Sequence, residues 1–266
     1  MDLGLSGKTA IVTGGASNIG KAIAEGLVAE GANVVIADVD CVQAEKVTEQ
    51  LCKTGPGDAL FIEADVTNAQ QIEQMVERTL EHFGQIEILI NNAGWTANGL
   101  FLDKPVEDFE REIAINLWGP INCVRAVAPS MIARSSGKII TIGSDAGRVG
   151  EYQEAVYSAC KGGIIAWSKA LAREFGRYQL TVNVVCPGLT LPESSDDAGA
   201  NSLWHSDSHQ SRIFQNDEVL AKVVRRYPLR RHGVPSDIVP IVLLLASDKS
   251  SYTTGQVISV SGGYAM

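Results

Sequence analysis

The sequence predicts an α/β protein: a single domain, residues 1–266, built on a doubly wound parallel sheet with helices on both faces. Short apolar runs rich in β-branched residues alternate along the chain with longer amphipathic segments. Strands that are separated by single helices need crossover connections, which make neighbouring strands parallel. The 266 residues are 45% hydrophobic and 20% charged, which is enough apolar material for one packed core.

Strands and helices are expected to follow one another in a regular order. Each expected strand is a short, largely apolar run, and continuous runs of this kind are typical of strands covered on both faces. The expected strands are 9–12, 34–37, 59–63, 88–90, 138–142, 181–185 and 256–260. The longer amphipathic segments predict helices at 20–30, 42–53, 69–83, 105–134 and 155–177.

One polar segment interrupts this alternation. Residues 192–215 are rich in Ser, Asp, Asn, Gly and His and follow shortly after the sixth expected strand. Long loops in this position are commonly disordered or serve as active-site lids. We expect a substrate lid at about residues 190–228, called the lid below, in preference to a plain surface excursion.

Composition limits the classes of function. The chain has 22 Lys and Arg against 31 Asp and Glu, a net charge of −9, and nothing in it favours nucleic-acid binding. Its five cysteines form no CxxC pair and, with four histidines, show no zinc-ligand spacing, so we expect reduced thiols and no metal. No signal-peptide pattern is visible, and the apolar stretch 241–246 is too short to span a membrane. We therefore expect a cytoplasmic protein without membrane contact.

A glycine-rich turn follows the first expected strand and leads into a helix. Glycines allow close approach of the backbone to a ligand, and the free N–H groups and dipole of a helix N-terminus attract a pyrophosphate. The spacing is TGxxxxxG, which on its own is weak evidence. Asn18 stands where a third glycine would be usual, and Asn tolerates left-handed backbone geometry. The candidate cofactor-binding residues are Gly14, Ser17, Asn18, Ile19 and Gly20.

Asp38 lies at the end of the second expected strand, 18 residues after Gly20. A carboxylate there can accept hydrogen bonds from a ribose 2′-OH and would repel a 2′-phosphate. No Lys or Arg adjoins it. An acidic residue at a strand end is unremarkable by itself, but together with the glycine-rich turn it favours NAD over NADP.

Polar residues also follow the third and fourth expected strands. Asp65 and the segment Asn91–Gly94 are ordinary turn residues individually. In a parallel sheet, however, both would lie at the carboxyl edge, where open α/β sheets bind their ligands. Their position is therefore what makes them candidates.

The strongest catalytic pattern is Tyr157 and Lys161, four residues apart at the start of an expected helix. Residues at this spacing share one helix face. A neighbouring cation lowers the pKa of a phenol, so we expect Lys161 to bring Tyr157 within reach of general-base catalysis on an alcohol. Ser144, at the end of a strand, can hydrogen-bond the substrate oxygen, where negative charge develops.

In order along the chain, TGGASNIG, Asp38, Asp65-Val66, NNAG, Asn116, Ser144, YSACK and CPG resemble the short-chain dehydrogenase/reductase family. The resemblance covers essentially the whole chain and implies a Rossmann fold with a catalytic tetrad. In that tetrad Tyr157 is the acid/base, Lys161 lowers its pKa and binds the nicotinamide ribose, Ser144 polarises the substrate, and Asn116 holds a water. The family further implies cofactor contacts at Asp65, Val66, Asn92, Ala93, Gly94, Pro187, Gly188 and Leu189.

One departure from the family pattern concerns the residue five positions after Pro187. The family often has Thr there, whereas this chain has Pro192. Thr190 is the candidate substitute for that cofactor contact.

A closer similarity is found in NNAGW, SDAGRVG, EAVYSACKGG and TGQVISVSGG. These strings resemble the alicyclic members that oxidise 2-hydroxycyclohexanecarboxyl-CoA, which implies an alicyclic secondary alcohol as the small-molecule substrate. Family resemblance also implies a homotetramer built on the helices 105–134 and 155–177. Candidate pocket walls are Trp95, Ser144, Asp145, Gln153, Glu154, Leu189 and Trp204.

Three questions stay open at this point. The basic run 222–232 is either a cationic rim for an anionic substrate or a solvated surface, and charge runs are more often the latter. A 3-oxoacyl-thioester reductase using NADPH is a second enzyme hypothesis, and Asp38 argues against it. A dinucleotide-binding regulator without catalysis is a third, and the complete tetrad argues against that.

Overall fold

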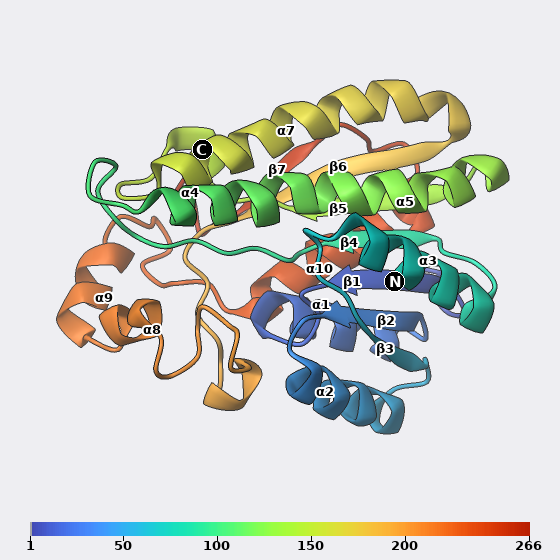
Figure 1. The fold of residues 1–266 in the computed structure, drawn as a ribbon, viewed down its shortest axis with the longest axis horizontal. Helices are drawn as coiled ribbons and strands as arrows, with labels where there is room; N and C mark the ends of the chain where they lie inside the picture. The colour runs from blue at the N-terminus through green and yellow to red at the C-terminus, as the bar shows by residue number, and fades with distance from the viewer. Residues whose placement is uncertain (1) are drawn as a thin grey trace.

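Seven parallel strands form the centre of the molecule (Figure 1). The computed structural model describes residues 2–266. The strand order is β3-β2-β1-β4-β5-β6-β7 and every neighbouring pair is parallel, which confirms the predicted fold class. The strands are β1 Thr9–Thr13, β2 Asn33–Asp38, β3 Ala59–Glu63, β4 Ile88–Asn91, β5 Gly137–Ile142, β6 Leu180–Pro187 and β7 Val257–Val260.

Helices connect these strands. The α-helices are α1 Asn18–Ala29, α2 Cys41–Thr54, α3 Ala69–Phe83, α4 Val106–Ile113, α5 Gly119–Arg134, α6 Ala146–Val149, α7 Ala155–Phe175, α8 His209–Phe214, α9 Asp217–Val224 and α10 Pro235–Ala246. A π-helical turn, η1 Ala114–Trp118, joins α4 to α5. Short 3-10 turns lie at Gly176–Tyr178, Ser195–Asp197 and Asp248–Ser250. Within residues 2–266, no helix is long and apolar enough to cross a membrane.

The sheet separates two apolar cores. Successive strand residues point to opposite faces, so Ala10 and Val12 pack against α1, α2 and α10, whereas Ile11 packs against α3, α5 and α7. All five residues of β1 are buried. This two-sided burial is what selects the continuous apolar runs of the sequence.

The strands β2 and β3 follow β1 on one side of it, whereas β4 to β7 follow on the other side. Strand β1 pairs with β2 on one side and β4 on the other, so the connections leave a crevice between the carboxyl ends of β1 and β4. Thr13, Asp38, Asn91 and Pro187 end their strands at this edge. The candidate residues of the sequence analysis are therefore gathered here.

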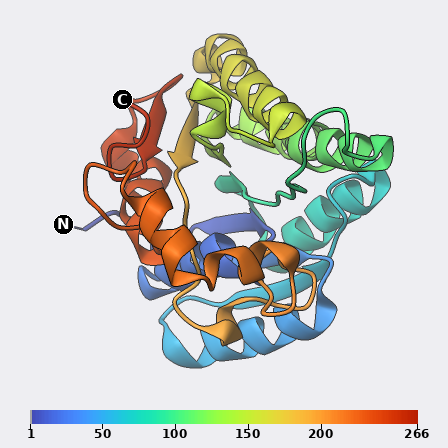
Figure 2. The same ribbon diagram turned by 90° about the vertical axis from the view of Figure 1, so that its left-hand side faces the viewer.

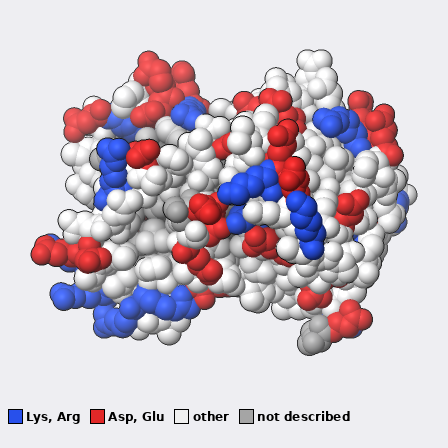
Figure 3. Space-filling model, turned by 90° about the horizontal axis from the view of Figure 1, so that it is seen from below, with Lys and Arg blue, Asp and Glu red and all other residues white. Residues whose placement is uncertain are grey.

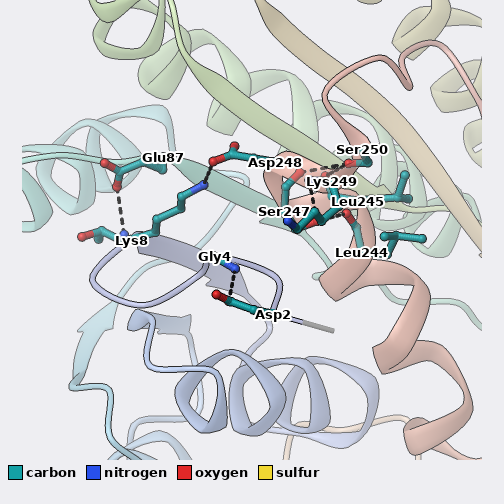
Figure 4. Close-up of polar contacts among 11 residues, drawn as sticks. Asp2, Gly4, Lys8, Glu87, Leu244, Leu245, Ser247, Asp248, Lys249 and Ser250 are labelled. Carbon is teal, nitrogen blue, oxygen red and sulfur yellow. Dashed lines mark hydrogen bonds and ion pairs between the residues drawn. The ribbon is translucent and has the colours of Figure 1, made fainter.

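The opposite edge of the sheet is held by polar contacts near the N-terminus (Figure 4). The Lys8 ammonium binds the Asp248 carboxylate at 2.7 Å, and the Thr9 N–H donates to Glu87 at 2.9 Å. The Lys8 hydrogen bond lowers the pKa of Asp248 below its ordinary value. These contacts join the start of the first strand to the segment after α10 and to the residue before β4, away from the ligand edge.

Two helix predictions need correction. The expected helix 105–134 is interrupted by η1, where one extra residue enters a turn, and Pro120 then opens α5. Helix α10 was not predicted, because Pro240 lies inside its apolar run; Pro235 in the first turn and Asp237 nonetheless start it. The lid is not an unstructured loop, since it contains α8 and α9. In Figure 2 the orange segment that contains α8 and α9 lies in front of the blue N-terminal part of the chain.

Candidate active site

A cavity of about 990 Å³ opens at the carboxyl edge of the sheet. Its wall combines the strand ends, the start of α7 and one side of the lid. Of the predicted site residues, only Gly20 and Asn116 do not line it. Those that do are Gly14, Ser17, Asn18, Ile19, Asp38, Asp65, Val66, Asn92, Ala93, Gly94, Trp95, Ser144, Asp145, Gln153, Tyr157, Lys161, Pro187, Gly188, Leu189 and Thr190.

The glycine-rich turn is shaped by close backbone contacts. A Cβ on Gly20 would lie 2.1 Å from the Gly14 carbonyl oxygen, so only glycine fits there. Gly14 has φ of +62° and Asn18 has φ of +48°, which confirms the expected left-handed geometry at Asn18. The Asn92 amide donates to the carbonyls of Thr13 and Gly14, at 3.0 and 2.9 Å, and holds the turn against β4.

This turn leaves polar groups available to a ligand. Ser17 precedes α1 without a side-chain cap, so the helix keeps free N–H groups beside the cavity. Asn18 Oδ1 is buried and has no hydrogen-bond partner among residues 2–266. A pyrophosphate with its adjoining ribose fits such a set of donors and acceptors.

Asp38 is fixed at the end of β2. Its two carboxylate oxygens accept hydrogen bonds from the N–H groups of Ala16 at 3.0 Å and Asp40 at 3.1 Å. Burial raises the pKa of Asp38, and these hydrogen bonds counter the rise. The carboxylate is thus oriented by the backbone at the cavity wall, as recognition of a ribose hydroxyl requires.

Lys161 is buried beneath Tyr157 on the first turns of α7. Its ammonium donates to the Ile142 carbonyl at 2.9 Å and lies 5.6 Å from the centre of the Tyr157 ring. Burial lowers the pKa of Lys161 to about 8. The Ser144 hydroxyl, at the end of β5, accepts the N–H of Ala146 at 3.1 Å.

The expected depression of the Tyr157 pKa is not observed for the polypeptide by itself. Burial raises the pKa of Tyr157, and the nearby Glu154 raises it further, while a hydrogen bond with the Ser144 side chain acts in the opposite direction. Desolvation of the phenolate, which the spacing of Tyr157 and Lys161 does not reveal, is the largest cause of this rise, and the positive charge of an oxidised nicotinamide would act against it.

Asn116 lies behind the cavity wall in the π-turn η1 and is fully buried. Its side-chain amide donates to the carbonyls of Trp95, at 2.6 Å, and Glu112, at 2.9 Å, and its oxygen accepts the Trp95 N–H at 3.2 Å. The side chain therefore fixes the segment after the NNAG turn.

A buried ion pair next to Asn116 was not anticipated. The Lys104 ammonium contacts the Glu112 carboxylate, and both side chains are at most 3% exposed. The Thr96 hydroxyl and the Ala97 N–H donate to the same oxygen, at 2.8 and 3.2 Å. The pair anchors residues 96–104 to α4. Nothing local in the sequence marks it, since both residues look like surface charges.

The other residues predicted to line the substrate pocket differ in whether their side chains already bind other protein groups. The Asp145 carboxylate accepts from the Ser259 hydroxyl and lies 3.6 Å from Arg148, so the protein itself uses it. The Trp95 indole stacks under the Arg111 guanidinium, 4.2 Å from the ring centre. Apolar side chains supply much of the rest of the wall: Leu189, Leu203, Trp204, Ile213, Phe214, Val219 and Val223.

The basic run 222–232 is partly committed to internal contacts. Arg226 contacts Glu151 at 3.4 Å and also the Tyr264 hydroxyl. Arg231 makes two hydrogen bonds to Asp237, at 2.5 and 2.7 Å. Arg226 and Arg231 therefore hold the base of the lid. This role is favoured for them instead of a cationic rim that would bind an anionic substrate.

The start of the lid is tied to the glycine-rich turn and α2. Lys21 binds Asp197 at 2.5 Å, the Gly199 N–H donates to the Ser17 hydroxyl at 3.0 Å, and the Asn201 N–H donates to Asp40 at 3.3 Å. A Cβ on Gly199 would lie 2.5 Å from an Asp40 oxygen. The first part of the lid is therefore fixed to the glycine-rich turn and to the start of α2.

A parallel sheet with an anion-binding turn, an acidic β2 end and a Tyr–Lys pair in one cavity defines a dinucleotide-dependent oxidoreductase. The family model described as enoyl-(acyl carrier protein) reductase matches residues 14–265. The chain belongs to the short-chain dehydrogenase/reductase family, whose members bind nicotinamide dinucleotides.

Individual proteins agree with this assignment. The 3-oxoacyl-(acyl-carrier-protein) reductase FabG of Staphylococcus aureus is 35% identical over 260 residues, 97% of this chain and 98% of that protein. An uncharacterized oxidoreductase of Mycobacterium tuberculosis is 36% identical over 259 residues, 97% of each chain. The crystal structure of a proposed gluconate dehydrogenase from Agrobacterium tumefaciens matches with a TM-score of 0.87 at 31% identity, covering 98% of this chain and 96% of that one.

Proposed function

We propose that the protein is an NAD-dependent oxidoreductase that interconverts a secondary, alicyclic alcohol and its ketone. The observation that carries this proposal is the placement of Tyr157, Lys161 and Ser144 in the same cavity as the glycine-rich turn. The cofactor end and the reacting end are thereby continuous, as transfer between a dinucleotide and an alcohol requires.

When NAD is bound, its nicotinamide ring supplies the hydride acceptor. Tyr157 takes the hydroxyl proton of the alcohol, and Ser144 donates a hydrogen bond to the substrate oxygen. The Lys161 ammonium lies beneath the Tyr157 ring and stabilises negative charge on the phenol oxygen. Asn116 holds the Trp95 segment in place, and the family resemblance implies that it also holds a water of the proton relay.

Asp38 supports NAD over NADP. Its oriented carboxylate can accept from a ribose 2′-OH, whereas a 2′-phosphate would meet a negative charge at this wall. Asp40 lies two residues further on, also with a carboxylate, and adds to that repulsion. We also propose a cytoplasmic homotetramer built on α5 and α7; sedimentation at several protein concentrations tests its stoichiometry.

The apolar walls around Trp95, Leu189 and Trp204 support a ring substrate, because an alicyclic ring buries apolar area against them. A second candidate is a 3-oxoacyl-thioester reductase. The similarity to the 3-oxoacyl-(acyl-carrier-protein) reductase FabG of Staphylococcus aureus favours it.

A panel of substrates separates the two candidates. We would follow NADH formation with cyclohexanol, 2-hydroxycyclohexanecarboxylate, its CoA thioester and a linear 3-hydroxyacyl-CoA, each with NAD and with NADP. Turnover of a ring alcohol with NAD supports the proposal. Activity confined to the linear thioester, with no ring turned over, assigns the protein to the second candidate.

A further inference from the structure

Glu154 is a cavity residue that the tetrad does not use. It stands at the first position before α7, and its carbonyl accepts the Ser158 N–H at 2.7 Å, so the helical turn begins there. Tyr157 follows three residues later, and both side chains line the cavity. The charge of Glu154 raises the pKa of Tyr157, so the two groups interact across the cavity. The Glu154 carboxyl is therefore a neighbour of the reacting phenol.

The other acidic groups around it are occupied. Glu151 is bound by Arg226 and by the Tyr264 hydroxyl, and Glu112 by Lys104. In the part of the chain that the structure describes, the Glu154 carboxyl has neither a hydrogen-bond donor nor an ion-pair partner, although it is partly buried. A half-buried carboxyl that no protein group pairs with is available to a ligand in the cavity.

The charges that face Glu154 make its surroundings acidic. Burial raises its pKa to about 7, Glu151 and Glu112 add to the rise, and Lys104 partly offsets it. The other cations at the cavity are engaged elsewhere. Lys161 donates to a backbone carbonyl, Arg226 to Glu151 and Tyr264, and Arg111 stacks on Trp95.

We propose that Glu154 selects substrates by charge: it admits an uncharged group, such as an ester, thioester or hydroxyl, beside the carbinol carbon and rejects a free carboxylate there. A specificity of this kind rests on repulsion of the wrong substrate. The inference builds on the proposed oxidoreductase function and specifies its substrate class as uncharged next to the reacting centre.

The test compares 2-hydroxycyclohexanecarboxylate with its methyl ester, a pair that differs in charge at one group. The readout is the acid-to-ester ratio of kcat/KM, in which the shared chemistry at Tyr157 cancels. In the wild type we expect the acid to be disfavoured increasingly as pH rises through 7, since Glu154 then becomes charged. Glu154→Gln should raise the ratio about tenfold above that pH and abolish the decline centred on pH 7, leaving only the change near pH 8 at which Lys161 loses its charge.

Glu110→Gln is the matched control, because it removes the same charge from an exposed position on α4 outside the cavity. Titration calorimetry with cyclohexanecarboxylate and its methyl ester gives the same comparison of affinities without turnover. An acid-to-ester ratio that is identical in wild type and Glu154→Gln at every pH would overturn the role of Glu154. If no ring alcohol is turned over but calorimetry still shows that the ester binds more tightly than the acid, only the proposed function is contradicted.

Discussion

The backbone N–H of Gly199, in the lid, donates to the hydroxyl of Ser17, in the glycine-rich turn, at 3.0 Å. Together with the Lys21–Asp197 ion pair, this contact ties the lid to the cofactor end of the cavity. The far side of the lid meanwhile lines the substrate end with Trp204 and Phe214. One segment thus lies beside both the glycine-rich turn and the wall of the proposed substrate end, so its opening is expected to accompany cofactor exchange.

Asp197→Asn should therefore loosen the lid. The Lys21 ammonium loses its charged partner, and we expect the rate constant of NADH release to rise about three- to tenfold, with a similar rise in KM for NAD. Stopped-flow fluorescence of NADH measures it. Asp207→Asn, an exposed lid position 3.8 Å from Arg212, is the control. Equal effects of the two substitutions would show that the Lys21 contact does not control release.

Cofactor preference is expected to depend on Asp38. Asp38→Ala removes both the ribose hydroxyl acceptor and the repulsion of a 2′-phosphate, so the NAD-to-NADP ratio of kcat/KM should fall at least about tenfold. Glu63→Gln tests whether general charge matters, since Glu63 pairs with Asp38 in register on β3 but lies outside the cavity wall. An unchanged NAD-to-NADP ratio in Asp38→Ala would show that Asp38 does not determine the cofactor preference.

The rate of alcohol oxidation should rise with pH. Burial raises the pKa of Tyr157 above its ordinary value, so the fraction of ionised phenol is small at neutral pH and grows with each added pH unit. We expect kcat/KM for oxidation to increase between about pH 6 and pH 9, whereas that for ketone reduction, which uses the protonated phenol, should stay nearly constant. Oxidation that is flat or falls over this range would contradict Tyr157 as its base.

Glu154 should also affect how the free energy of unfolding depends on pH. Its folded pKa, about 7, lies above the ordinary carboxyl value of 4.5, so its contribution to the free energy of unfolding is greatest below 4.5 and is lost as pH rises toward 7. After allowance for solvent screening, Glu154→Gln should be more stable than wild type at pH 8 by on the order of 1–2 kcal/mol. Urea unfolding at pH 5 and pH 8 checks this. A variant less stable than wild type at pH 8 would contradict it.

Much of the architecture follows from local patterns. The seven strands are apolar runs that need both faces covered, and such runs are recognisable because burial leaves little other choice of residue. The glycine-rich turn is equally local, since Gly14 has a φ of +62° and a Cβ on Gly20 would clash with the Gly14 carbonyl oxygen. The residues that follow the strands then lie together at the carboxyl edge because the strands are parallel.

What the sequence could not predict depends on distant contacts. Lys104 and Glu112 look like solvated charges until α4 and the preceding loop come together around them. The lid contacts at Ser17 and Asp40 involve partners more than 150 residues away. The pKa of Tyr157 depends on burial, which a spacing of four residues to Lys161 does not reveal. Long-range packing, rather than any local motif, therefore decides how the site is tuned.

The most direct test of the central claim is the turnover of a ring alcohol with NAD by the wild type and by Tyr157→Phe. The account predicts steady NADH formation by the wild type and a loss of kcat of about a hundredfold or more in the variant, from removal of its acid/base group. Calorimetry should show that the variant binds NAD within about threefold of the wild type, as the ring and Lys161 remain. Turnover by Tyr157→Phe at the wild-type rate would contradict the assignment of this site.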